Sequence, residues 1–152
     1  MIINMEKEFS RVRSAKDITI FASLIIIGSV LVALPTGAGI NTAGFFLIFT
    51  GAILALVLRT GYKDSETGEK YRIQEYYFQQ SLQSCIASAI SSKPDTLDLD
   101  EADKGNGLKL EIFYSKSTGK AYLRLFEYVP YRYEPCSQTY EHDLDKVTKL
   151  IR

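Results

Sequence analysis

A long segment of this sequence has no ionisable side chain. From Ile18 to Leu58, 41 consecutive residues include no Asp, Glu, Lys, Arg or His, whereas about a quarter of the residues in an average soluble domain are charged. All 18 basic and 18 acidic side chains therefore lie outside this segment. Such a run argues against an ordinary soluble fold here and predicts that the segment is embedded in a membrane.

Other absences narrow the class of function. The formal net charge is zero, without the basic excess that nucleic-acid binding usually needs, so nucleic acid is not a predicted partner. The sequence has two cysteines without CxxC spacing, a single histidine, and no P-loop or serine-elbow motif. We therefore predict no cofactor, no metal ion and no enzymatic activity. One alternative stays open, in which Cys136 and His142 serve a membrane-tethered enzyme as nucleophile and base.

The acidic stretch that begins at Asp95 matches a calcium-binding loop only in part. With Asp100 at loop position one, Gly105 and Glu111 occupy positions six and twelve, as an EF-hand requires. Positions three and five are Ala102 and Lys104, whose side chains are not calcium ligands. The acidic stretch is therefore predicted to be a solvated loop.

The charge-free segment divides into two apolar spans. Residues 18–34 and 43–58 are rich in Ile, Leu, Val and Phe, and between them Pro35 and the following Gly and Asn residues have turn chemistry. Each span is about 24–26 Å long as a helix, and a few flanking residues bring it to the roughly 20 residues that a bilayer requires. The pattern predicts a transmembrane helical hairpin, residues 18–58. Because a second span follows so closely, a cleaved signal peptide is not favoured.

Charges beside the hairpin predict its orientation. The basic residues Lys7, Arg11, Arg13 and Lys16 precede the first span, and Arg59 and Lys63 follow the second. The turn between the spans is uncharged. Since positive flanks remain in the cytosol, we expect a protein of the cell membrane with both termini cytosolic.

Small residues within the second span suggest close helix packing. Gly44 and Gly51 lie one heptad apart, and Gly51 and Ala55 form a small-xxx-small pair. They permit the two spans of one chain to approach each other, or copies of the chain to associate. The spacing fits either arrangement.

The N-terminal residues 1–17 are predicted to form an amphipathic helix on the inner membrane surface. Ile2, Met5, Phe9 and Val12 recur at three- and four-residue intervals, with charged residues between them.

The polar remainder predicts a small cytosolic domain. Residues 59–70 form a linker, and residues 71–152 form an α+β domain with an antiparallel sheet. Residues 79–92 have helical periodicity, and residues 142–151 also have apolar residues at helical spacing. Two period-two segments flank a hairpin turn over residues 115–119, which predicts paired strands.

Tyrosine and arginine gather in the second half of this domain. Both types are enriched at binding hot spots, so we predict a ligand or partner surface formed by Tyr122, Arg124, Tyr128, Tyr131, Arg132 and Tyr133. The alternative is a sheet face that merely carries amphipathic tyrosines.

These observations lead to a functional expectation. The chain is predicted to be a non-enzymatic membrane-anchored protein whose cytosolic domain binds a partner or a small ligand. Its expected partners are the lipid bilayer, further copies of the chain, and an unidentified cytosolic protein or small ligand. The main alternative is a homo-oligomeric, ligand-gated membrane effector or channel, in which Gly44 and Gly51 form the contacts between chains.

Overall fold

The computed structural model describes residues 7–152 of the chain. The chain divides into two compact units. One unit contains Ser10–Tyr62, and the other contains the chain before Ser10 together with Lys63–Arg152. We call them the helical hairpin and the sheet domain, and the fold is α+β.

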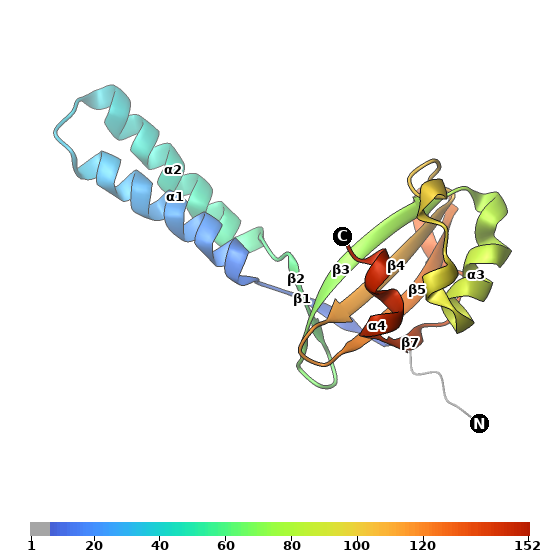
Figure 1. Cartoon of the computed structure of the whole chain (residues 1–152). Helices are drawn as coiled ribbons and strands as arrows, with labels where there is room; N and C mark the ends of the chain where they lie inside the picture. The colour runs from blue at the N-terminus through green and yellow to red at the C-terminus, as the bar shows by residue number, and fades with distance from the viewer. Residues whose placement is uncertain (1–6) are drawn as a thin grey trace. The chain divides into compact units, whose positions relative to one another are not determined.

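Two apolar helices pack against each other in the helical hairpin (Figure 1). Helix α1 spans Ala15–Ala33 and helix α2 spans Ala38–Val57. Both begin earlier than the predicted spans. Helix α1 begins directly after its cap Ser14, and α2 begins at Ala38 because the connecting turn occupies only residues 34–37, where Gly37 has a positive φ of 113°. At 19 and 20 residues, each helix is about 29–30 Å long, which matches the hydrocarbon core of a bilayer. Both helices are therefore long and apolar enough to cross a membrane.

The segment before α1 differs from the amphipathic helix that is predicted for residues 1–17. Phe9–Val12 is strand β1, not part of an amphipathic helix, whereas Ile2 and Met5 lie outside the described residues. This segment is a strand because it pairs with β2 (Gly61–Asp64), which follows the two helices in the sequence. The local periodicity of residues 1–17 does not indicate this contact. Ser14 then caps α1 through a capping box with Asp17.

The sheet has the strand order β1-β2-β3-β4-β5-β6, and β7 also pairs with β5. Its longer strands are antiparallel and lie side by side in Figure 1. Strand β2 lies within the segment 59–70 that the sequence predicts to be a linker. The remaining strands are β3 (Lys70–Phe78), β4 (Leu108–Ser115), β5 (Lys120–Val129), β6 (Arg132–Pro135) and β7 (Tyr140–Asp143).

Short helices cover one face of this sheet. Helix α3 (Gln83–Ser92) follows a 3-10 turn at Gln80–Leu82, and α4 (Leu144–Val147) continues into another at Thr148–Leu150. Further 3-10 turns occupy Pro94–Thr96 and Leu99–Glu101. The predicted helix over residues 142–151 is shorter than expected, because its first residues are held in β7 by pairing with β5.

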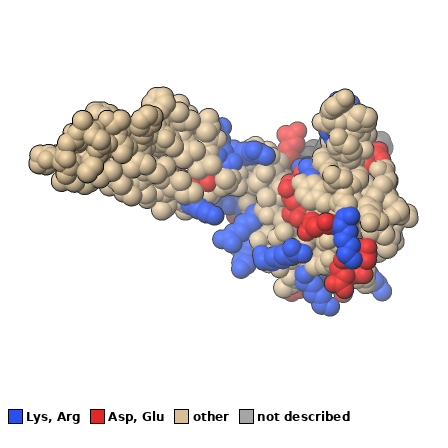
Figure 2. All heavy atoms as spheres, turned by 90° about the horizontal axis from the view of Figure 1, so that it is seen from above, with Lys and Arg blue, Asp and Glu red and all other residues tan. Residues whose placement is uncertain are grey.

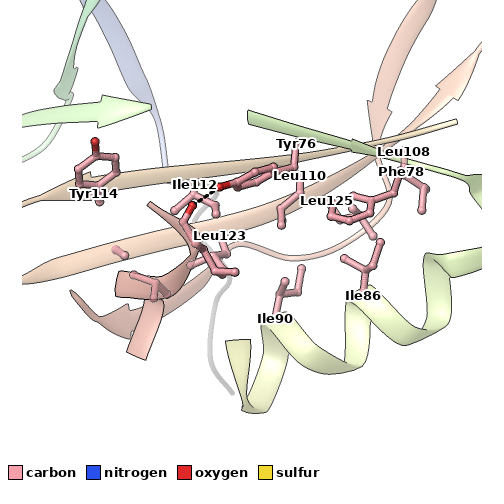
Figure 3. Close-up of a cluster of buried hydrophobic side chains, with 13 residues drawn as sticks. Tyr76, Phe78, Ile86, Ile90, Leu108, Leu110, Ile112, Tyr114, Leu123 and Leu125 are labelled. Atoms are coloured by element: carbon pink, nitrogen blue, oxygen red, sulfur yellow. Dashed lines mark hydrogen bonds between the residues drawn. The ribbon is translucent and has the colours of Figure 1, made fainter. Parts of the chain in front are cut away.

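The hydrophobic core lies between these helices and the sheet (Figure 3). Alternate residues of β4 and β5 point into it, and the register sets Leu110 opposite Leu125 and Ile112 opposite Leu123. The Tyr76 hydroxyl is buried with them and donates to the Leu150 carbonyl at 2.6 Å, which ties β3 to the C-terminal turn. The opposite face of the sheet carries the other alternate residues, and among these are several of the predicted surface residues.

Candidate functional site

The turn between β5 and β6 presents an exposed aromatic side chain. Val129 pairs with Arg132, so Pro130 and Tyr131 are the two central residues of the turn. Tyr131 has a φ of 72° and is 98% exposed. A positive φ at the second central residue after proline is the pattern of a type II turn, where glycine is the usual occupant. An exposed tyrosine in this backbone conformation is unfavourable for folding alone, which makes it a candidate for function.

Neighbouring aromatic residues support this turn. Tyr128 is 50% exposed and lies edge-on to its cross-strand partner Tyr133, with ring centroids 5.4 Å apart. The Tyr133 hydroxyl donates to the Asn106 carbonyl at 2.8 Å. Arg132 is exposed and forms an ion pair with Glu134. We call the group Tyr128, Tyr131, Arg132 and Tyr133 the aromatic tip.

The other two predicted surface residues are not part of the aromatic tip. Arg124 is half-buried on the sheet face, where its Nε donates to Glu111 Oε2 at 2.8 Å. Glu111 is only 7% exposed and also pairs with Lys109 at 2.9 Å. Both cations lie against the Phe126 ring, whose centroid is 4.8 Å from Lys109 Nζ and 5.2 Å from Arg124 Cζ. The charges of Arg124 are therefore largely engaged within the sheet domain.

Tyr122 is buried because the segment before the helical hairpin covers it. The Phe9 ring stacks on Phe113 at 4.1 Å and lies 5.7 Å from the Tyr122 ring. The Lys7 ammonium lies 5.3 Å from the Tyr122 ring centroid and pairs with Asp64 at 2.7 Å. The predicted surface set is thus divided, with four residues at the aromatic tip and two inside the sheet face.

Asp64 anchors this N-terminal segment, and sequence reasoning missed it. Its carboxylate accepts hydrogen bonds from the Glu66 amide and the Thr67 hydroxyl, both at 2.9 Å, in addition to the Lys7 pair. Burial opposes its ionisation, but these hydrogen bonds outweigh burial and lower the pKa of Asp64 below its ordinary value. Burial would likewise lower the pKa of Lys7, yet its hydrogen bonds to Asp64 and Glu66 raise it. The Asp-x-Glu-Thr turn is the one local signal that sequence offered.

We expect the substitution Lys7→Met to destabilise the sheet domain by about 1 kcal/mol, because Asp64 retains only its neutral donors. Because the pKa of Asp64 is lowered in the folded state, its ionised form stabilises the fold above about pH 3.9. This stabilisation is lost as the pH falls through the pKa of the folded state. The raised pKa of Lys7 means that its contribution exists below about pH 10.4 and is lost only at higher pH.

Thermal melting of the full chain in detergent should therefore show a constant difference between wild type and Lys7→Met from about pH 5 to pH 9, shrinking below about pH 4. The matched control is Lys149→Met, which changes an exposed lysine of the last 3-10 turn. Equal effects of the two substitutions would contradict the assigned role of Lys7.

The carboxylate of Asp17 joins the residue before α1 to the residues after α2. Asp17 is 1% exposed, and its oxygens accept from the Ser14 amide at 2.9 Å, the Thr60 amide at 2.8 Å and the Thr60 hydroxyl at 2.6 Å. It thereby joins the start of α1 to the residues that follow α2. No motif predicts this role, because its partner lies 43 residues away.

Three glycines permit the close approach of α1 and α2. A Cβ atom at Gly44 would lie 2.7 Å from the Gly28 carbonyl oxygen, and one at Gly51 would lie 2.7 Å from Ile25 Cγ1. Gly44 and Gly51 therefore face α1 of the same chain. Ala55 is half-buried, and its carbonyl accepts from Arg13. Gly28 is absent from the predicted packing set, because the sequence does not indicate which face of α1 meets α2.

The structure keeps Cys136 and His142 apart. The Cys136 amide donates to the Leu125 carbonyl, whereas His142 pairs with Ala121. These two partners, Leu125 and Ala121, are four residues apart on β5, which corresponds to about 13 Å. His142 Nε2 lies 2.5 Å from the Ile90 carbonyl oxygen. Burial, with a smaller effect of the Glu127 charge, raises the pKa of the Cys136 thiol, which disfavours the nucleophilic thiolate.

Residues 7–152 contain no group of three or more His, Cys, Asp or Glu side chains placed to hold a metal ion. No family model matches the sequence, and neither a curated protein nor a solved structure matches it. The fold thus defines an α+β protein with an apolar helical hairpin.

Proposed function

We propose that this chain is a non-enzymatic protein of the cell membrane, anchored by its helical hairpin, whose cytosolic sheet domain binds a partner protein through the aromatic tip. One observation carries the proposal. Among residues 7–152, the exposed large hydrophobic side chains lie on the helical hairpin, with two exceptions, Tyr128 and Tyr131. Each group has its own explanation.

A bilayer accounts for the exposed side chains of the helical hairpin. Figure 2 shows tan surface over most of the visible face of the helical hairpin, and residues 18–58 contain no charge. Apolar side chains in such number are stable only when something other than water covers them. The basic residues on both flanks and the uncharged turn support an orientation with both termini in the cytosol.

A protein partner accounts for the two exposed tyrosines. Tyr131 projects from a turn whose geometry Pro130 helps to set, so little conformational entropy is lost when the ring is bound. Tyrosine and arginine are preferred at hot spots because they combine apolar area with hydrogen-bonding groups. A projecting turn fits a partner that offers a recess for the ring.

Site-specific photocross-linking in cells tests this function. We expect p-benzoylphenylalanine at position 131 to yield one discrete adduct, and the same residue at position 149 to yield none. The further substitution Arg132→Ala should weaken the adduct at position 131. A diffuse set of adducts equal at both positions would overturn the assignment of the aromatic tip.

The substitution Tyr131→Gly should separate binding from stability. Glycine adopts the positive φ without steric cost, so we expect the sheet domain to gain about 1 kcal/mol. Partner capture should nevertheless be lost, because the anchoring ring is gone. Thermal melting of the detergent-solubilised chain measures the first effect, and recovery of the partner identified by cross-linking measures the second. A stabilised variant that still captured this partner would show that Tyr131 is not the anchor.

A homo-oligomeric membrane effector is the second candidate, and one feature of α2 favours it. Phe45, Phe46 and Phe49 are all more than half exposed and line an open hollow of about 470 Å³ on the outward face of the helix. Because Gly44 and Gly51 already face α1, contacts between chains would use these phenylalanines instead. The mass of the detergent-solubilised protein should then be that of a closed oligomer, which Phe46→Ala with Phe49→Ala should dissociate. A monomeric wild type would exclude this candidate.

A further inference from the structure

A second surface hollow lies in the sheet domain, where β3 begins and β4 ends. It has a volume of about 300 Å³ and is lined by Lys70, Tyr71, Arg72, Tyr114, Ser115, Lys116 and Ser117. Figure 3 shows Tyr114, which lies on its wall, at the far end of the hydrophobic cluster from Leu108 and Phe78. From Leu108, which pairs beside the aromatic tip, to Ser115 is about 23 Å along β4. The hollow and the aromatic tip therefore lie at opposite ends of the sheet.

The hollow gathers positive charge that no carboxylate of the described residues neutralises. Within residues 7–152, Lys70, Arg72 and Lys116 have no carboxylate oxygen within 4.0 Å. Nearby cations of the same sheet are paired, such as Lys120 with Glu141 at 2.7 Å. The β3–β4 register ends with Arg72 opposite Tyr114, and Lys116 follows Ser115, the last residue of β4. Like charges gathered in one place repel each other, and an anion bound between them would relieve that repulsion.

Hydroxyl groups complete the wall of the hollow. Ser115 Oγ and Ser117 Oγ lie 2.9 Å apart, and Thr118 donates its amide to Ser115 Oγ at 3.4 Å. The Tyr71 hydroxyl lies 3.3 Å from Thr118 Oγ1, while its ring is held against Phe9 at 5.1 Å. The side chains around the cations are thus positioned before any ligand arrives, which lowers the entropic cost of binding.

We propose that this hollow binds a phosphate-bearing anion. Phosphate oxygens accept charge-assisted hydrogen bonds from arginine and lysine and ordinary ones from hydroxyl groups, and residues of all three kinds line the hollow. Its volume lies at the lower end of the range for small-molecule sites, which suits a phosphate group with little attached bulk. The anion is either the headgroup of a membrane lipid or a soluble phosphate compound. Binding here is independent of the partner bound at the aromatic tip.

Titration of the full chain in neutral-detergent micelles distinguishes the two sources. One probe is inorganic pyrophosphate, and the other is a short-chain phosphatidylinositol phosphate. Isothermal titration calorimetry should show saturable binding of at least one probe, weakened as salt is raised. Saturation by pyrophosphate identifies a soluble ligand, whereas saturation by the lipid alone identifies a headgroup.

The variant Arg72→Gln with Lys116→Gln removes two of the three cations and should weaken binding by roughly 10- to 100-fold. The matched control, Lys146→Gln with Lys149→Gln, removes the same charge from α4 and the turn after it, outside the hollow, and should change the affinity less than about threefold. Unchanged melting temperatures of both variants show that the fold is intact. The absence of saturable binding of either probe, or equal losses in the two variants, would overturn the proposal.

Discussion

The substitution Gly44→Ala is expected to separate the two helices and to destabilise the helical hairpin by about 2–3 kcal/mol. The added Cβ atom would lie 2.7 Å from the Gly28 carbonyl oxygen and 2.9 Å from Val32 Cγ2. The first of these is a backbone atom, so no side-chain rotation relieves the overlap. Titration with sodium dodecyl sulfate in mixed micelles, followed by circular dichroism or protease sensitivity, measures the loss.

Gly39→Ala is the matched control for this experiment. Gly39 also lies in α2, but a Cβ atom there would meet nothing within 4 Å. Alanine has the higher helix propensity, so this variant should be neutral or more stable by up to about 1 kcal/mol. If Gly39→Ala and Gly44→Ala lowered the stability equally, the packing of α1 on α2 through the glycines would be wrong.

The substitution Glu111→Leu is expected to destabilise the sheet domain by about 3 kcal/mol. Glu111 is buried between Lys109 and Arg124, at 2.9 Å and 2.8 Å respectively. Its removal leaves two half-buried cations without their shared carboxylate, and each then loses solvation without compensation. Thermal and chemical unfolding of the full chain measure this change.

A double substitution supplies the control for the Glu111 experiment. Glu111→Leu with Arg124→Leu should recover much of the lost stability, because one unpaired cation is removed and the Lys109 side chain is long enough to reach water. The substitution Arg132→Leu removes the ion pair of an exposed arginine with the half-buried Glu134 and should change stability by less than about 1 kcal/mol. Failure of the double substitution to recover stability would show that Glu111 acts through packing and not through its charge.

The apolar helices were predictable because their signal is compositional. A run of 41 residues without charge needs no tertiary contact to be recognised, and Pro35 marks the end of its first half. The strands β4 and β5 were also predictable, since Leu108, Leu110 and Ile112 alternate with residues of the opposite face. In each of these elements the pattern repeats within one short segment.

Prediction failed where the deciding partner is distant in sequence. Phe9 and Val12 match a helical spacing, but pairing with β2 makes this segment a strand. In the sequence Asp17 resembles an ordinary residue at a helix start, but in the fold it binds Thr60. Asp64 likewise resembles a turn residue, but in the fold it pairs with Lys7. Contacts between segments 43 or more residues apart depend on the whole fold, so they produce no periodic pattern in the local sequence.

The candidate surface shows the same division between sequence and tertiary structure. The abundance of Tyr and Arg after residue 120 leads to the prediction of a binding surface, but it does not indicate which side chains remain exposed. Tyr122 is covered by Phe9, and Arg124 is paired with Glu111. Tyr131 stays exposed, because a tight turn at positive φ leaves its side chain no neighbouring element to cover it. Sequence alone therefore determined the apolar hairpin and the residue types of the surface, while pairing between distant strands decided which of those residues face water.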